Sequence, residues 1–258
     1  MSFQTITYTL AAGVATIALN RPEVMNALSR QMRAELLQAV QRSAAEARVL
    51  VLTGNGRAFC SGQDLGDAAA VGALDLETIL NEEYVPLLKA ITDSPIPTIS
   101  AVNGTAAGAG ANLALAADVV IAADSASFIQ AFTRIGLVPD AGGSYWLPRQ
   151  IGLARAMGAI LFADKITARQ AVDWGMIYES VPDLDFAAHI TARAQSLAAG
   201  PTVAYRGVKT ALRASSGNDL DAQLALEARL QGECGATADF REGVAAFLEK
   251  RPARFTGA

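Results

Sequence analysis

Two turns of small residues, each after a predicted strand, could place backbone N–H groups around an anion. The first, "NGTAAGAGANLALAADVV" (103–120), follows the strand "PIPTISAV" and leads into the helical run "ANLALAA". Glycine costs roughly 0.5–1 kcal/mol relative to alanine in a regular element, so these glycines need a steric or conformational reason. A helix that begins here leaves first-turn N–H groups without partners. The turn could therefore receive a phosphate or a developing oxyanion, or its small residues could serve only helix–sheet packing.

Neither familiar phosphate-binding motif matches this turn. A dinucleotide fingerprint needs a glycine three residues after Gly110, where the chain has Leu113. A P-loop needs lysine followed by a hydroxyl residue after its last glycine, and Ala111 and Asn112 stand there instead.

The second turn, "NGRAFCSGQDL" (55–65), follows the strand "RVLVLTG". Two such turns at the ends of neighbouring strands could each direct one N–H group at a single point. That is the requirement of an oxyanion hole, whose donors lie roughly 2.7–3.1 Å from the oxygen that gains charge. Together the two turns are a more specific signal of catalysis than either turn alone.

Composition limits the classes of partner. The 258 residues are 52% hydrophobic, enough for one large α/β domain or for a domain with an appendage. A formal charge of −4 and the lack of a Lys/Arg run argue against nucleic acid as a partner. No stretch approaches the roughly 20 apolar residues of a membrane span, and "MSFQTITYTL" does not resemble a signal peptide. We therefore expect a cytoplasmic protein without a membrane partner, in which Cys60 and Cys234 are reduced thiols.

Acid–base chemistry must fall to a carboxylate, a tyrosine or a lysine. The single histidine, His189, lies in a helical stretch with no nucleophile motif beside it, which argues against a Ser-His-Asp hydrolase. No Cys/His/Glu cluster has the spacing of metal ligands, so we expect no metal site.

These candidate groups require an α/β scaffold. Apolar spacing predicts a hairpin over 3–19, a helix in "SRQMRAELLQAVQRSAAE" and a buried strand in "ARVLVLTG". A helix near 75–93, strands at 97–102 and 117–123 and a helix after Gly110 follow, which implies a parallel sheet covered on both faces. Strand signals end near 183. The sequence predicts an α/β core over 1–182 and a helical region over 183–258.

Several segments together resemble the crotonase, or enoyl-CoA hydratase/isomerase, superfamily over essentially the whole chain. They are "LNRPEVMNAL" (19–28), "AFCSGQDL" (58–65), "AVNGTAAGAGANLALAADVVIA" (101–122), "IGLVPDAGGSYWLPRQIG" (135–152) and "AAFLEKRPARF" (245–255). The resemblance implies a spiral of ββα units, a C-terminal helical trimerisation region, and trimers that often pair into hexamers. It also implies acyl-CoA thioester substrates, with no cofactor besides the coenzyme A of the substrate.

The resemblance assigns roles to the two turns. The thioester oxygen would be held by the backbone N–H groups of Gln63 and Ala109, with CoA across 59–65 and its adenine near "AFCSG". Hydratases of the family use two glutamates to activate water, and the matching positions hold Asn112 and Phe132, which cannot act as bases. Positions expected to contact the substrate are Phe59, Ser61, Gly62, Asp64, Gly108, Gly110, Asn112, Phe132, Tyr145, Phe247 and Lys250.

Asp140 in "GLVPDAGG" matches the position of the catalytic acid of several isomerases of the family. It could instead cap the following helix, which stabilises by about 1 kcal/mol. Both roles could coexist, since a cap position would lower its pKa. Asp64 is expected to serve mainly as a turn or helix cap, and Tyr145 to line an acyl pocket. Phe247 and Lys250 match residues that reach the CoA of a neighbouring subunit, or belong to an ordinary amphipathic helix.

Within the family, three phrases are most similar to isomerases that convert ring-1,2-epoxyphenylacetyl-CoA to the oxepin thioester. They are "GTAAGAGANLALAADVVIAA", "SASFIQAFTRIGLVPDAGGSYWLP" and "EGVAAFLEKR". Relatives also shift double bonds from the 3,4 to the 2,3 position. Both reactions need a base beside a stabilised enolate. The alternatives are a 2-enoyl-CoA hydratase with unusual residues and a catalytically weak acyl-CoA-binding protein.

Overall fold

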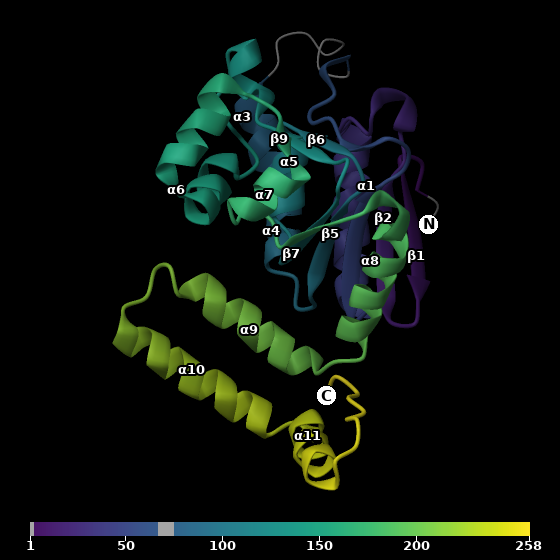
Figure 1. Ribbon diagram of the computed structural model, residues 1–258, viewed down its shortest axis with the longest axis vertical. Coiled ribbons are helices and arrows are strands. Elements are labelled where there is room, and N and C mark those ends of the chain that lie inside the picture. Colours follow the sequence, from purple (N-terminus) through teal and green to yellow (C-terminus); the bar gives the residue numbers. More distant parts are fainter. Residues whose placement is uncertain (1–2, 67–74) are drawn as a thin grey trace.

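Two β-sheets form the centre of the protein in the computed structural model, which describes residues 3–66 and 75–258 (Figure 1). The larger sheet has the order β1-β2-β3-β5-β7-β10, in which β1 and β2 form an antiparallel hairpin and every later pair is parallel. Its strands are β1 (Ile6–Ala11), β2 (Val14–Leu19), β3 (Val49–Gly54), β5 (Thr98–Val102), β7 (Val119–Ala123) and β10 (Glu179–Val181).

A smaller sheet of short strands, in the order β4-β6-β8-β9, accompanies the larger one. Its members are β4 (Ala58–Cys60), β6 (Thr105–Ala107), β8 (Ser127–Ile129) and β9 (Ile166–Thr167). The chain passes from β3 to β4, from β5 to β6 and from β7 to β8, so each turn adds one strand to each sheet before a helix follows. This confirms the predicted spiral of ββα units and corrects the expectation of a single sheet.

Both faces of the larger sheet are covered, as the continuous apolar run of β3 predicted. Leu50 and Leu52 belong to the main hydrophobic core, whereas Val49 and Val51 face a second apolar cluster on the opposite side. The helix α1 (Arg30–Glu46) packs in the main core through Leu36 and neighbouring residues, and its N-terminus is capped by Ser29. The helix α8 (Asp183–Ala198) covers the second cluster.

The other helices of the core connect successive strands of the two sheets. The short helices are η1 (Pro22–Val24) and η3 (Ala131–Ile135), and the stretch from Leu76 to Thr92 comprises α3 (Leu76–Ile79), the π-helical η2 (Leu80–Tyr84) and α4 (Val85–Thr92). The helices between the later strands are α5 (Ala109–Leu115), α6 (Gly143–Phe162) and α7 (Ala168–Asp173).

The C-terminal helices confirm the predicted change to all-helical structure after residue 183. Beyond α8, the helices α9 (Thr202–Ala214), α10 (Leu220–Gly235) and α11 (Ala238–Glu249) extend away from the sheets at one end of the molecule (Figure 1). Lys209 and Arg213 of α9 form ion pairs with Asp118, each at 2.7 Å, which anchor this helix to the core. The boundary at 182 stays a prediction, since α8 itself packs on the sheet.

The described helices include none that combines the length and the apolar character needed to cross a lipid bilayer.

Candidate active site

In the turn after β4, Leu28 lies on one side of the backbone and the N–H group of Gln63 points to the other side. Leu28 N donates to Gly62 O at 2.8 Å, and Asp64 N donates to Leu28 O at 3.3 Å. Because the backbone groups of successive residues in an extended segment point to opposite sides, the Gln63 N–H points away from Leu28. Gly62 has φ +96°, a conformation that favours glycine.

The second turn leads into α5, which begins at Ala109. Gly108 precedes it with φ +51°, and the first bond within the helix runs from Asn112 N to Gly108 O at 3.2 Å. Ala109 N–H therefore has no acceptor within its own helix. A Cβ placed on Gly62 would lie 3.4 Å from Ala109 N, so the two turns are in direct contact. The structure thus brings the two predicted donor segments together.

Glycine is required at different positions of the 103–120 turn for two different physical reasons. Gly108 needs a positive φ, whereas Gly104 and Gly110 lie against the segment that leads into the other turn. A Cβ on Gly110 would lie 2.6 Å from Cys60 Sγ, and one on Gly104 would overlap the backbone of Arg57. Close packing therefore accounts for two of these glycines, and it holds the two turns against each other.

Gly110→Ala is expected to lower the free energy of unfolding by about 1–3 kcal/mol, the usual cost of forcing a methyl group into a packed site. Gly158→Ala is the matched control, because a Cβ there meets nothing within 4 Å in the interior of α6. That control should gain roughly 0.5–1 kcal/mol. Chemical denaturation of both variants measures the difference. An unchanged midpoint for Gly110→Ala would contradict the close contact between the turns.

Asp140 lies in the loop before α6, next to the start of α5. Asn112, in the first turn of α5, donates from Nδ2 to the backbone carbonyl of Asp140 at 2.8 Å. Gln130 Nε2 donates to Asn112 Oδ1 at 2.9 Å, and both amide side chains are fully buried. Ala141, which follows Asp140, has φ +48°, a strained backbone conformation of a kind that occurs at functional sites.

The carboxyl group of Asp140 is held in an unfavourable environment for its charge. Its Oδ1 is buried and has no hydrogen-bond partner among the residues that the structure describes. Burial raises the pKa of Asp140 from 3.8 to about 6, against the opposing effect of a hydrogen bond from its own backbone. A carboxylate with a pKa near 6 is ionised at neutral pH and is a stronger base than an ordinary carboxylate, as general-base catalysis favours.

The capping alternative for Asp140 is wrong. The N-cap of α6 is Gly142, with no side-chain cap, and Asp140 contributes only its backbone carbonyl, which accepts from Gly143 N at 2.9 Å. The expectation that a cap position would lower the pKa of Asp140 is wrong for the same reason. The helix begins two residues too late for the carboxylate to reach its first N–H groups.

The side chain of Gln63 is held by two residues that the sequence analysis did not identify. Tyr84 donates its hydroxyl hydrogen to Gln63 Oε1 at 2.5 Å, and Arg33 Nη1 donates to the same oxygen at 3.0 Å. Arg33 is 2% exposed and pairs with Glu83 at 2.6 Å. The sequence does contain a pattern that could have indicated the burial of Arg33, because Arg33 precedes Leu36 and Val40 at helical spacing on the buried face of α1.

Several predicted contact residues are buried by their own chain. The Phe59 side chain is fully buried in the core, so only its backbone could reach a substrate. Asn112 uses both ends of its amide within the protein, and it positions the Asp140 loop. Phe132 is 5% exposed, and its ring tip would lie 3.9 Å from a Cβ on Gly108.

Other predicted residues lie at the surface of the turns or of α6. Ser61 donates its hydroxyl hydrogen to Val24 O at 3.2 Å. Asp64 pairs with Arg21 at 2.7 Å and accepts from Gly66 N at 3.0 Å, which fits the expected structural role. Tyr145 is half-exposed, with its ring edge-to-face against Trp146.

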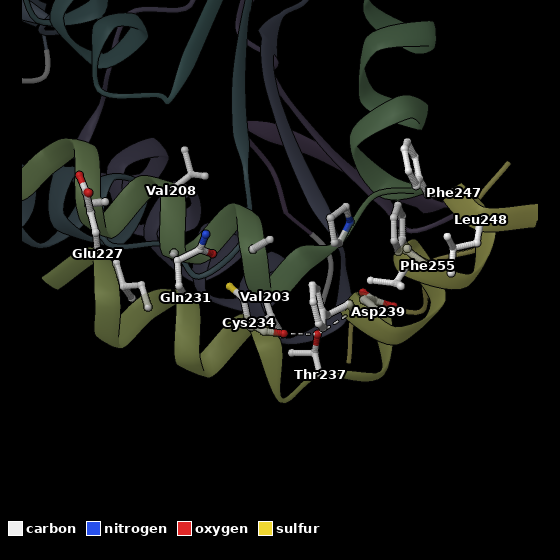
Figure 2. A pocket seen from close by; sticks show the side chains of 18 residues that line it. Val203, Val208, Glu227, Gln231, Cys234, Thr237, Asp239, Phe247, Leu248 and Phe255 are labelled. Atoms are coloured by element: carbon white, nitrogen blue, oxygen red, sulfur yellow. Dashed lines mark hydrogen bonds between the residues drawn. The ribbon is translucent and has the colours of Figure 1, made fainter. Parts of the chain in front are cut away.

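Phe247 and Lys250 lie on and directly after α11, at the opposite end of the molecule from α5 and α6 (Figure 1). A single chain therefore does not bring them to Gln63, Ala109 and Asp140. Phe247 instead lines an apolar groove of about 700 Å³ between α9, α10 and α11, whose side chains are shown in Figure 2. A role for these residues at CoA requires another subunit.

The single histidine pairs with a carboxylate, and the two cysteines form no disulfide. His189 lies on α8, and its Nε2 is 2.7 Å from Oε1 of Glu179 on β10. Cys60 and Cys234 are free thiols, as predicted, and burial raises the pKa of Cys60 to about 12. Within residues 3–66 and 75–258, no group of His, Cys, Asp and Glu side chains is arranged to hold a metal ion.

Comparison with known proteins identifies the family and the fold of the chain. The sequence model of the enoyl-CoA hydratase/isomerase family matches residues 9–258. A Rhodobacter capsulatus protein named probable enoyl-CoA hydratase is 66% identical over the full length of both chains. The 1,2-epoxyphenylacetyl-CoA isomerase of Escherichia coli is 46% identical over 95% of each chain. A crystal structure of enoyl-CoA hydratase from Bacillus anthracis superimposes with a TM-score of 0.92 at 33% identity, covering 99% of this chain and 100% of that one.

Proposed function

Because the chain belongs to the enoyl-CoA hydratase/isomerase family, we propose that it is an acyl-CoA isomerase with Asp140 as its base. The observation that carries this proposal is the Asp140 carboxyl group, with a buried, unpartnered Oδ1 and a pKa of about 6 beside the start of α5. The two positions that hold glutamates in hydratases of the family are occupied by Asn112 and Phe132, which are both buried.

In this proposal the thioester oxygen accepts hydrogen bonds from the backbone N–H groups of Gln63 and Ala109. Asp140 removes a proton from the carbon next to the thioester carbonyl, and the two donors stabilise the resulting enolate. The proton then returns to a carbon further along the chain or ring, so that no atom is gained or lost. The reaction moves a proton and an electron pair, and we propose that it needs no metal or redox cofactor.

The proposed substrates are ring-1,2-epoxyphenylacetyl-CoA, which would give the oxepin thioester, and 3-enoyl-CoA, which would give 2-enoyl-CoA. The name of the Escherichia coli relative supports the first substrate. For the epoxide, ring expansion breaks the carbon–carbon bond of the epoxide and keeps both carbon–oxygen bonds, and the proton taken from the carbon next to the thioester returns to a ring carbon. We further propose that the enzyme acts in the cytoplasm.

Hydration of 2-enoyl-CoA is the second candidate, and the name of the Rhodobacter capsulatus relative favours it. It would require water to be activated without the two glutamates, with Asp140 as the candidate base. Incubation with 3-enoyl-CoA and, separately, with 2-enoyl-CoA distinguishes the two reactions. We expect a double-bond shift and little water addition. Formation of 3-hydroxyacyl-CoA as the main product would favour a hydratase. The absence of a reaction with either substrate would indicate an acyl-CoA-binding protein with little catalytic activity.

We also propose that the chain forms a trimer or a pair of trimers through its C-terminal helices. Exposed apolar side chains line or flank the groove of Figure 2, among them Val208, Phe240, Phe247 and Leu248. Leu220 and Leu224 of α10 are 71% and 52% exposed, more apolar surface than a monomer would leave in water. Sedimentation at micromolar concentration should show a trimer or hexamer. A stable monomer would count against this assembly.

If a neighbouring subunit brings α11 to the CoA site, Phe247→Ala and Lys250→Ala should weaken acyl-CoA binding without changing the turnover of bound substrate. Titration calorimetry with CoA and steady-state kinetics measure the two quantities. Arg241→Ala, also on α11, is the control, because Arg241 Nη1 donates to the backbone carbonyl of Ala236 at 3.2 Å, just before the start of the same helix. Equal CoA affinity in all three variants would remove the C-terminal helix from the substrate site.

A further inference from the structure

Two buried side chains, from α1 and η2, converge on the side-chain carbonyl of Gln63, and one of them also donates to the backbone carbonyl of Leu28. Arg33 comes from α1, Tyr84 from η2, and Leu28 from the segment before α1. Arg33 Nη1 donates both to Gln63 Oε1 at 3.0 Å and to Leu28 O at 2.5 Å. The same Leu28 flanks the Gln63 peptide through its hydrogen bonds to Gly62 and Asp64. One guanidinium group therefore ties both the side chain and the neighbouring backbone of Gln63.

Tyr84 completes this arrangement from the other side. Its hydroxyl donates to Gln63 Oε1 at 2.5 Å, and its ring lies 5.0 Å below the Arg33 guanidinium in a cation–π contact. The tyrosine is 3% exposed, and burial raises its pKa, so the hydroxyl stays protonated and remains a donor. It belongs to a π-helical turn, a geometry that occurs frequently at functional sites.

The charge of Arg33 is balanced within the same set. Glu83, the neighbour of Tyr84, accepts from Arg33 Nε at 2.8 Å and from Nη2 at 2.6 Å. A buried ion pair is weak evidence of a contribution to stability, because its desolvation costs about as much as the attraction returns. The pair does hold the guanidinium in place, and the same guanidinium donates to Gln63 Oε1.

We propose that Arg33 and Tyr84 are positioning residues that clamp the side chain of Gln63 and thereby hold its backbone N–H in the direction of the thioester oxygen. This inference rests on the proposed oxyanion hole. A preorganised donor stabilises the enolate because it does not reorient during the reaction. A Gln63 free to rotate would keep its N–H group and lose part of that benefit.

The clamp is tested with Tyr84→Phe, which keeps the ring and its contact with Arg33 and removes one hydrogen bond. Gln63→Met removes the acceptor of both donors and keeps the backbone N–H. Each variant is expected to lower kcat roughly 10-fold with little change in KM, a part of the about 10²–10³-fold cost of losing a donor outright. The double variant should be no worse than Gln63→Met alone, because that substitution already removes the acceptor of the Tyr84 hydroxyl.

Tyr8→Phe is the matched control. Tyr8 also lies under an arginine, with Arg42 at 4.4 Å from its ring, but on β1 and outside the site. Arg33→Lys keeps the positive charge and loses the several N–H donors of the planar guanidinium group. It should lower kcat as Tyr84→Phe does, and Arg42→Lys is its control. Circular dichroism and CoA binding verify that each variant is folded.

A second readout does not depend on which reaction the enzyme catalyses. Butanoyl-CoA labelled with ¹³C at its thioester carbonyl can neither isomerise nor add water, and its carbonyl stretch in the bound state reports the strength of the two N–H donors. We expect a shift to lower wavenumber in the wild type and in Tyr8→Phe, and a smaller shift in Tyr84→Phe and Gln63→Met. The full shift in the last two variants would overturn the clamp alone. No shift in the wild type would overturn the oxyanion hole and, with it, the clamp.

Discussion

Asp140→Asn is expected to lower isomerase turnover by about 10²–10⁴-fold, the usual contribution of a positioned base. The amide has nearly the same size as the carboxyl group and cannot accept a proton at neutral pH. The backbone carbonyl of Asp140, which accepts from Asn112 and Gly143, is unchanged by the substitution. CoA affinity should therefore remain close to that of the wild type. Steady-state kinetics with 3-enoyl-CoA and titration with CoA measure both quantities.

The same substitution is expected to leave the protein at least as stable at pH 7–8. The folded-state pKa of Asp140 is about 6, above the reference value of 3.8, so the folded protein binds this proton more tightly than the unfolded chain does. The stability associated with this group is therefore present below pH 3.8 and is lost as the pH rises through about 6. Asparagine removes that loss. Near-normal turnover in Asp140→Asn, with unchanged stability, would show that another group is the base.

Ala109→Pro is expected to lower turnover by about 10²–10³-fold, because it removes one N–H donor of the proposed oxyanion hole. Ala109 is the first residue of α5, the one helical position at which proline is favoured. The residue before it is Gly108, which is free of the restriction that a Cβ would add before proline. The substitution should thus remove the donor and retain the helix. Circular dichroism and CoA affinity check the fold.

Ala109→Gly is the matched control for this prediction. It keeps the N–H group and loses only a buried methyl group, so turnover should stay within a few-fold of the wild type. If Ala109→Pro folds, binds CoA and turns over at the rate of Ala109→Gly, then the Ala109 N–H does not stabilise the enolate.

The long elements of the fold could be predicted because their signals are local. The helical spacing of apolar residues such as Leu36 and Val40 predicted α1, and the run "VLVLTG" predicted β3. The smaller sheet was missed because its strands are two or three residues long, as in Thr105–Ala107, which is too short for an alternating pattern to be recognised. Such segments form strands only because the larger sheet places them side by side.

The sequence predicted the backbone donors of the site better than the roles and contacts of its side chains. Glycine patterns located the turns of Gln63 and Ala109, since Gly62 and Gly108 are required there by a positive φ, which is a local property of the backbone. The sequence could not decide between a base and a cap for Asp140, because this depends on α6 beginning at Gly143. The contacts of Tyr84 and Arg33 with Gln63 join segments 21 and 30 residues away in the chain, and only tertiary packing reveals them.

The pH dependence of kcat/KM for isomerisation of 3-enoyl-CoA tests the central claim that Asp140 is the base. This ratio reports the pKa of the essential group in the free enzyme. We predict that it falls as the pH drops through about 6, the pKa to which burial raises Asp140, and that it is level between pH 7 and 8. The affinity for CoA over the same range separates ionisation of the substrate phosphates from that of the enzyme. A ratio that is unchanged between pH 5 and pH 8, once CoA affinity is taken into account, would contradict the assignment of Asp140.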